Sequence, residues 1–224
     1  MEEKISFRIL RWIFTRLTPK MKTVWEVPYD GTPSVFCPNH EGMIGPIDMV
    51  CHFDLHRQSR AWFNADVSEF RKMPAYVRQD YWWEPGCKME WLYNATIPYL
   101  GALILPPIMK TVPGVKVYHD MQVLKTFRKS IEVLRGGENL IIFPQQPDGY
   151  KSHHMWINKG FLQIAPMAWR TLKMPLNFYP VYIDSQNHVI HVRRPIRFDP
   201  ERTLAQQEQE MLDRLAKGLL KEGV

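Results

Sequence analysis

Short apolar runs alternate with stretches of helical periodicity along most of the chain. Continuous runs of β-branched and aromatic residues are typical of strands in a sheet that is covered on both faces. Such runs predict strands at residues 34–37, 61–65, 115–118, 140–143, 177–183 and 189–192. Apolar residues at helical spacing predict helices at 47–56, 121–134 and 160–172. The alternation predicts an α/β fold, a single domain with a mixed, largely parallel sheet flanked by helices.

The clearest expected helix lies near the C-terminus. Asp199 can act as its N-cap, and Pro200 suits its first turn. Its apolar stripe consists of Leu204, Met211, Leu215 and Leu219. A helix with one such stripe packs that face on the core.

The N-terminal region has the pattern of a basic amphipathic helix. Beyond the first four residues its charges are all positive, at Arg8, Arg11, Arg16, Lys20 and Lys22. Its apolar side chains are Phe7, Ile9, Leu10, Ile13, Phe14 and Leu17. Two interpretations fit: a helix packed on the core with a solvated basic face, or a helix in a membrane interface with Trp12 at headgroup level. We divide the chain into 1–24, this candidate membrane helix, and 25–224, the α/β domain.

A second membrane candidate is the uncharged stretch from Trp91 to Met109, which approaches the ~20 residues that span a bilayer. Pro98, Gly101 and the Pro106-Pro107 pair are expected to interrupt a helix here, and lipid cannot satisfy the freed backbone groups. We therefore expect a broken apolar segment rather than a spanning helix. Such a segment forms buried core or, with the aromatic residues at 81–83, part of a hydrophobic slot or membrane contact.

The net charge favours an anionic partner. The chain has 29 Lys and Arg against 23 Asp and Glu, a formal charge of +6, which suits phospholipid headgroups, coenzyme A or an acidic carrier protein. Nucleic acid is less favoured, because the aromatic residues cluster with aliphatic ones. The spacing of the three cysteines argues for a reducing compartment and against a disulfide framework or zinc site. His52 and His56 have metal-ligand spacing but no accompanying ligand pattern, so we expect no metal there.

The most informative stretch is residues 35–48, VFCPNHEGMIGPID. An apolar strand runs into Asn39-His40 and a small-residue turn, which can present one imidazole at the end of a buried strand. Ligands usually bind at strand ends in open α/β sheets, and His titrates nearest to neutral pH. His40 is therefore the candidate general base. Gly45 stands five residues later, where a carboxylate partner would be expected.

Four segments, within roughly residues 33–198, resemble in order the four motif blocks of the lysophospholipid (glycerol-phosphate) acyltransferase family. In that family the first block is Asn-His, four residues and Asp, so Asn39-His40 matches it and Gly45 takes the Asp position. The second block resembles residues 114–120, GVKVYHD, and the third resembles residues 143–149, FPQQPDG. The fourth, an apolar strand with prolines, resembles residues 174–183.

The resemblance implies a membrane-associated acyltransferase with a glycerol-phosphate acyltransferase-like fold. A fatty acyl group would pass from acyl-CoA or acyl carrier protein, the thioester donor, to a hydroxyl of a lysophospholipid or related lipid acceptor, with no cofactor or metal. His40 would deprotonate that hydroxyl while other groups hold the developing oxyanion. Because residues 1–4 do not start a secretory signal, we expect a peripheral protein on the cytoplasmic face of a membrane.

The same resemblance nominates the residues that bind substrate. From the matching blocks they are Asn39, Gly42, His119, Phe143, Pro144, Gln145 and Gln146. His119 stands where the family has a phosphate-binding Arg, which removes a bidentate clamp. Lys116 and Lys151 are the candidates to compensate. Gln145 stands where the family has Glu.

Asp48 is the candidate replacement for the missing orienting carboxylate. It is expected on the first turn of the following helix, and a Gly45-Pro46 turn can bring it toward His40. The alternative is an ordinary helix-start carboxylate favoured by the helix dipole. Glu41 and Asp148 are weaker candidates.

Two other functions fit the sequence. The polar departures at Gly45, His119 and Gln145 fall on the blocks that carry chemistry, whereas the apolar scaffold is kept. That distribution fits a lipid or acyl-chain binding protein with little or no catalysis. A thioester hydrolase ranks lowest, because no Gly-x-Ser-x-Gly nucleophile turn occurs.

Overall fold

The computed structural model describes residues 4–40, 44–79, 83–119, 121–147 and 155–221. Within these residues the central sheet has the strand order β1-β9-β8-β2-β5-β3-β4, with β10 paired to β8. The strands β8, β2, β5, β3 and β4 run parallel, whereas β9 and β10 are antiparallel to β8. Strand β1 is parallel to β9. The single-domain α/β fold with a mixed, largely parallel sheet is therefore confirmed.

The strands and helices have the following bounds. The main sheet consists of β1 Lys22–Trp25, β2 Val35–Pro38, β3 Ser59–Asn64, β4 Gly114–Val117, β5 Asn139–Ile141, β8 Asn177–Asp184, β9 Val189–Val192 and β10 Ile196–Arg197. A separate antiparallel pair is formed by β6 Gln145–Pro147 and β7 Met155–Ile157. The α-helices are α1 Ile5–Leu17, α2 Ile44–Cys51, α3 Met73–Gln79, α4 Glu90–Met109, α5 Val123–Arg135, α6 Ile164–Leu172 and α7 Leu204–Gly218. Short 3-10 helices cover His56–Gln58, Ala65–Ser68 and Lys159–Gln163.

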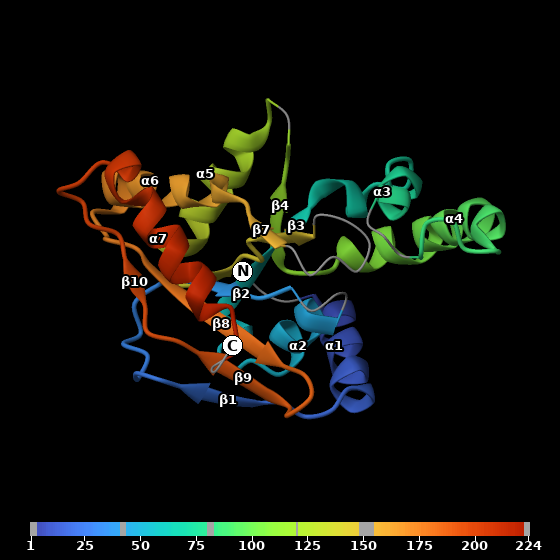
Figure 1. Ribbon diagram of the computed structural model, residues 1–224, viewed down its shortest axis with the longest axis horizontal. Helices are drawn as coiled ribbons and strands as arrows, with labels where there is room; N and C mark the ends of the chain where they lie inside the picture. The colour runs from blue at the N-terminus through green and yellow to red at the C-terminus, as the bar shows by residue number, and fades with distance from the viewer. Residues whose placement is uncertain (1–3, 41–43, 80–82, 120, 148–154, 222–224) are drawn as a thin grey trace.

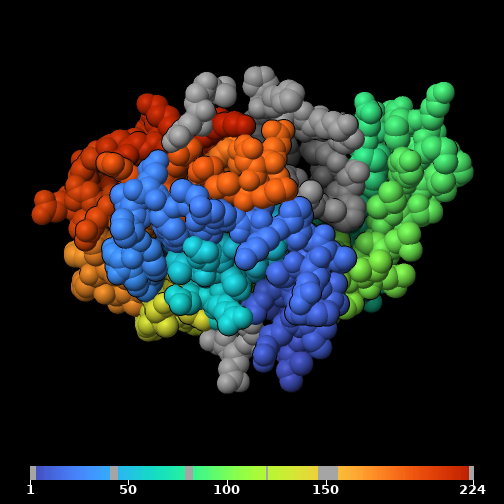
Figure 2. Space-filling view, turned by 90° about the horizontal axis from the view of Figure 1, so that it is seen from below, coloured from blue at the N-terminus to red at the C-terminus, as the bar shows by residue number. Residues whose placement is uncertain are grey.

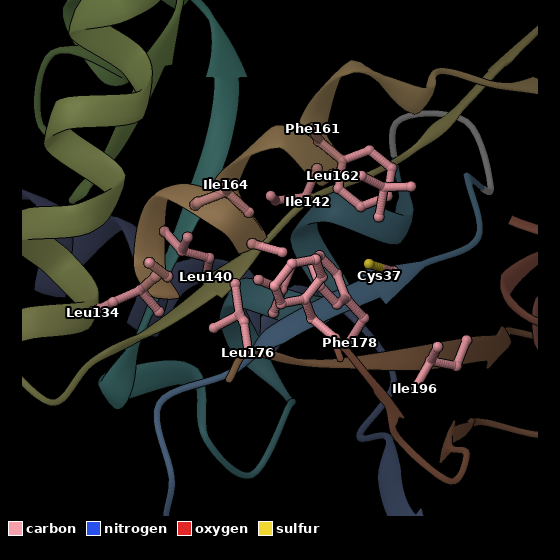
Figure 3. Packing of buried hydrophobic residues seen from close by; sticks show 14 of the residues in the cluster. Cys37, Leu134, Leu140, Ile142, Phe161, Leu162, Ile164, Leu176, Phe178 and Ile196 are labelled. Atoms are coloured by element: carbon pink, nitrogen blue, oxygen red, sulfur yellow. The ribbon is translucent and has the colours of Figure 1, made fainter. Parts of the chain in front are cut away.

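Helices cover both faces of the sheet, and α3 and α4 project beyond its β4 edge (Figure 1). Side chains of β2 alternate between the two faces, as the period of a strand requires. Val35 and Cys37 enter the cluster under α5, α6 and α7, whereas Phe36 enters the cluster with Met49 of α2 and Phe53. Figure 3 shows the first of these clusters. Burial on both faces explains why the central strands are continuous apolar runs.

The helix predicted at 47–56 is wrong in its bounds, because α2 begins at Ile44 and ends at Cys51. The chain leaves the helix so that Phe53, which is fully buried, can join the core on this face. The imidazole of His52 then makes a 2.7 Å hydrogen bond with the Thr18 hydroxyl, just beyond the end of α1. Gly45 and Pro46 lie inside α2, so they do not form the turn expected from the sequence.

The cap predicted for the C-terminal helix is also wrong. The N-cap of α7 is Thr203, whose backbone N–H donates to the Gln206 side chain at 2.8 Å. The Asp199 carboxylate instead accepts from the backbone N–H of Glu201 at 2.9 Å. Asp199 therefore stabilises the turn before the helix rather than the helix terminus.

The expectation of a broken apolar segment is wrong, because Glu90–Met109 forms one helix of 20 residues, α4. Pro98 lacks the N–H that would bond to the carbonyl of Asn94, four residues earlier. That carbonyl instead accepts a 3.1 Å hydrogen bond from the guanidinium of Arg78, on α3. Arg78 also lies 5.5 Å from the ring centre of Tyr99. A neighbouring helix thus supplies the donor that the proline removes.

Helix α1 turns much of its apolar surface outward. Phe7 is buried, but the following apolar side chains are exposed: Ile5, Ile9, Trp12, Ile13 and Leu17. The helix therefore does not bury its whole apolar face on the core, which was the first of the two interpretations. The boundary set at residue 24 falls inside β1, which pairs with β9.

Candidate active site

The first and third sequence blocks meet at the carboxyl edge of the parallel sheet. Strand β2 ends at Pro38 and leads into Asn39 and His40, and β5 leads through Ile142 to Phe143 and Pro144. These two strands are neighbours, with Val35 opposite Leu140. Carboxyl ends of parallel strands are where α/β folds build ligand sites.

The polar residue of the third block holds the chain at His40. The Gln145 side-chain oxygen accepts a 3.0 Å hydrogen bond from the backbone N–H of His40. The rings of His40 and Phe143 pack edge to face with their centres 5.6 Å apart. Two residues of the FPQ sequence therefore fix the backbone and one side of the imidazole.

Asn39 ties the end of β2 to β8. Its side-chain oxygen accepts from the Ile183 N–H at 2.6 Å, and its side-chain nitrogen donates to the Ile183 carbonyl at 3.3 Å. The side chain is buried, at 8 % relative exposure. These contacts make Asn39 a residue that positions His40, and its nomination as a substrate-binding residue stays a prediction.

A cleft of about 510 Å³ opens beside His40. One side consists of Asn39, His40, Gln145 and Ile157, and the other comes from α7 and the residues that follow it: Leu212, Asp213, Ala216, Leu219 and Leu220. The cleft thus combines a polar end at the sheet with a largely apolar helical wall. The sequence did not reveal this wall, because the leucines of α7 have the spacing of an ordinary core stripe.

Gly45 is buried in α2, and its nearest neighbours include Asn39 and Phe143 beside His40. A Cβ placed on it would meet Ile183 Cδ1 at 3.5 Å, the Asn39 carbonyl oxygen at 3.7 Å and Phe143 Cε1 at 3.7 Å. These are ordinary van der Waals contacts, mostly with apolar atoms. The position at which the resembled family has a carboxylate is therefore surrounded mainly by hydrocarbon.

Asp48 is only 2 % exposed and lies on the second turn of α2, one turn later than the sequence predicted. Its backbone carbonyl accepts from the His52 N–H at 2.8 Å. The charge of its carboxylate contributes to raising the pKa of the Cys51 thiol, for which burial is the main cause. Its role as the orienter of His40 stays a prediction.

The second block lies farther away. His119 follows the end of β4 and is exposed, and Lys116 within β4 is half-buried. Strands β5 and β3 separate β4 from β2, which corresponds to about 14 Å at the spacing of neighbouring strands. The described residues that line the cleft beside His40 therefore do not include His119 or Lys116.

The remaining nominated residues fall into two groups. Pro144 is buried, and its carbonyl accepts from the Asn158 N–H at 2.9 Å. Gln146 lies in β6 opposite Trp156 of β7. Gly42 and Lys151, like the weaker carboxylate candidates Glu41 and Asp148, lie outside the described residues.

Comparisons with known proteins give one structural likeness. No protein-family model matches the chain, and no curated protein matches its sequence. Among solved structures, the chain is similar to the crystal structure of the 1-acyl-sn-glycerophosphate (LPA) acyltransferase PlsC from Thermotoga maritima. The TM-score is 0.48 and the sequence identity is 14%, over 97% of this chain and 81% of that one.

Among the described residues of the cleft, the imidazole of His40 is the candidate base. Cys37, in the strand that leads to His40, is fully buried, and burial raises the pKa of its thiol, which disfavours the thiolate nucleophile. Within the described ranges, no three His, Cys, Asp or Glu side chains are grouped so that they could hold a metal ion. The arrangement is suited to general base chemistry on a substrate bound in the cleft.

Proposed function

We propose that this protein is a peripheral acyltransferase on the cytoplasmic face of a membrane. It transfers a fatty acyl group from acyl-CoA or acyl carrier protein to a hydroxyl of a lysophospholipid or related lipid. The observation that carries the proposal is the cleft, which joins His40 and Gln145 to an apolar wall from α7. The order of the four sequence blocks supports it independently.

In this proposal His40 acts as general base and then as general acid. Its neutral ring nitrogen takes the proton of the acceptor hydroxyl as the oxygen attacks the thioester carbonyl. The tetrahedral oxyanion collapses, the carbon–sulfur bond breaks, and the departing thiolate takes the proton from the imidazolium. No covalent acyl-enzyme is formed, which agrees with the burial that raises the pKa of the Cys37 thiol and disfavours its thiolate.

The direct test is acyl transfer from labelled acyl-CoA to a panel of lysophospholipids. We expect His40→Ala to lower kcat/KM by about 10²–10⁴-fold, the usual contribution of a general base. The hydrogen bond from the His40 backbone N–H to Gln145 survives this change, so the variant is expected to fold. The melting temperature of His40→Ala, measured in parallel, checks this. Full activity in a folded His40→Ala variant refutes the mechanism.

The proposal keeps Asp48 as the group that orients the imidazole. A buried carboxylate is costly unless it is paired or hydrogen-bonded, and α2 starts four residues after His40. We expect Asp48→Asn to lower kcat with little change in KM, and to lower the pKa of His40 in an NMR titration, since a negative neighbour is lost. An unchanged His40 titration removes Asp48 from the mechanism.

We further propose that the acyl chain lies along α7. Ala216 lines the cleft on this helix, whereas Ala205 is exposed at its start. Ala216→Trp is expected to slow transfer from long-chain donors more than from short-chain donors, because the indole fills the apolar part of the cleft. Ala205→Trp is the matched control. Equal effects of the two changes place the chain elsewhere.

A second candidate function is lipid binding without turnover. It is favoured by the hydrocarbon around Gly45, where the resembled family has its carboxylate. In calorimetry this function predicts stoichiometric binding of lysophospholipid or acyl-CoA that Ala216→Trp weakens, with no product formed. Measurable turnover that depends on His40 decides against it.

A further inference from the structure

Helix α4 has an outer face that the described protein leaves uncovered. Tyr99, Leu100, Leu103 and Ile104 are 53%, 56%, 62% and 58% exposed. Residues three and four apart on a helix lie on one face. No charged residue occurs between Trp91 and Met109. Exposed apolar faces of this kind mark interaction sites.

The opposite face of α4 is fastened to α3. A Cβ on Gly101 would stand 3.4 Å from Val77 Cγ2, so the two helices approach closely. Ala102 shares a buried cluster with Met73 and Val77. With the Arg78 bond to the Asn94 carbonyl, these contacts hold one side of α4 against the domain. Among the described residues α4 alone has the length and composition to cross a membrane, but crossing would require it to leave α3.

The cations of α1 and the contact between α1 and α4 indicate which partner covers the exposed face of α4. The Lys4 ammonium donates to the Lys110 carbonyl at 3.2 Å, so the start of α1 adjoins the end of α4. Figure 2 shows the two helices on the same face of the molecule, α1 in blue and α4 in green. Neither residues 4–25 nor residues 91–119 contain an acidic side chain, whereas Arg8, Arg16 and Lys20 are exposed on or after α1. An apolar surface with cations at its side matches an anionic bilayer surface.

We propose that α4 docks in the plane of an anionic phospholipid bilayer, with Leu100, Leu103 and Ile104 in the acyl region and α1 alongside. The helix lies in the interface and does not cross the bilayer. This deepens the proposed function, on which it rests for the presence of a membrane substrate. Docking through α4 would bring the domain to the surface that holds a lipid acceptor.

Depth measurements on the full chain separate the two orientations. In a Cys87→Ser background, since Cys37 and Cys51 are buried, Thr96→Cys, Leu103→Cys and Pro107→Cys each carry one environment-sensitive fluorophore. The vesicles contain phosphatidylcholine, phosphatidylglycerol and lipids brominated at known depths, which quench the fluorophore according to its depth. We expect equal depths at the three positions, because they share the outer face. A crossing helix gives a difference of about 16 Å between the first and last positions, and that result overturns the proposal.

Binding is measured by vesicle co-sedimentation without any acyl donor. Leu103→Glu with Ile104→Glu is expected to weaken binding at least about tenfold, because two apolar side chains are replaced by charges. The control is Val24→Glu, at an exposed position of β1. Rising salt weakens wild-type binding, since the cations of α1 are screened. Unchanged binding in the double variant, or a concentration-dependent dimer that the variant abolishes, overturns the proposal.

Failure of this inference is distinguishable from failure of the proposed function. Vesicle binding that requires α4, in a protein with no transfer activity, leaves the docking surface standing and refutes only the acyltransferase. Conversely, transfer to a short-chain acceptor dissolved below its micelle concentration does not need docking. If the double variant keeps that activity and also keeps its vesicle binding, only the docking surface is refuted.

Discussion

The side chain of Gln145 holds the backbone of His40 through a 3.0 Å hydrogen bond. Gln145→Leu removes the acceptor for a half-buried N–H, so we expect the unfolding free energy to fall by about 1–3 kcal/mol. Gln145→Glu keeps an acceptor and adds a negative charge, which is expected to raise the pKa of His40. Chemical denaturation and an NMR titration of His40 measure the two effects. Equal stability of Gln145→Leu and wild type contradicts the positioning role.

Gly218 allows α7 to approach β8 closely. A Cβ at this position would lie 2.5 Å from Pro180 Cβ and 2.8 Å from its Cγ. Gly218→Ala is therefore expected to cost about 1–3 kcal/mol of stability, as overpacking does, and to widen or distort the cleft. Gly45→Ala meets nothing nearer than 3.5 Å and is the matched control, expected to stabilise by up to about 1 kcal/mol within a helix. Thermal unfolding of both variants checks the contrast.

Arg78 and Pro98 form a testable pair. We expect Arg78→Met to lower stability by about 0.5–1.5 kcal/mol, because the Asn94 carbonyl loses its donor. In a Pro98→Ala background the restored backbone N–H can bond to that carbonyl, so the same change is expected to cost less. A double-mutant cycle in denaturant gives the coupling energy. Additive effects show that Arg78 does not replace the missing N–H.

His52 is expected to make stability depend on pH. Burial, with a smaller contribution from His56, lowers the pKa of His52 from its usual value of 6.5. The folded state therefore binds its proton less readily than the unfolded state, and stability falls as pH decreases through about 6.5 toward the lowered pKa. His52→Gln keeps a polar group near Thr18 without titrating, and it should flatten this loss. His188→Asn, at an exposed turn, is the control, and equal pH profiles for wild type and His52→Gln contradict the assignment.

Local sequence patterns predicted the central strands well because those strands are buried on both faces. The run at 177–183 lies within β8, and the run at 34–37 overlaps β2, both of which are almost entirely buried. The meeting of His40 and Gln145 could be anticipated only through the order of the sequence blocks. Hydrophobic periodicity alone does not predict that β2 and β5 are neighbours in the sheet.

The features that the sequence did not predict depend on contacts between distant segments. Three prolines indicated a break in α4, but the donor that replaces the N–H of Pro98 comes from α3. The wall of the cleft comes from α7, whose leucines have the spacing of a core stripe. The change of direction after Cys51 follows from the burial of Phe53 rather than from a local signal.

The pairing of β1 with β9 places residues 22–25 beside residues 189–192, which are far apart in the sequence. The cleft likewise joins distant parts of the sequence, because residues 39 and 40 face a wall made by residues 212–220. During synthesis on the ribosome the sheet pairing cannot form before residues 189–192 have emerged, and the cleft cannot form before residues 212–220 have emerged. Such long-range closure is slow compared with local helix formation. The exposed apolar faces of α1 and α4 are thus available to a lipid surface or a chaperone well before the cleft beside His40 exists.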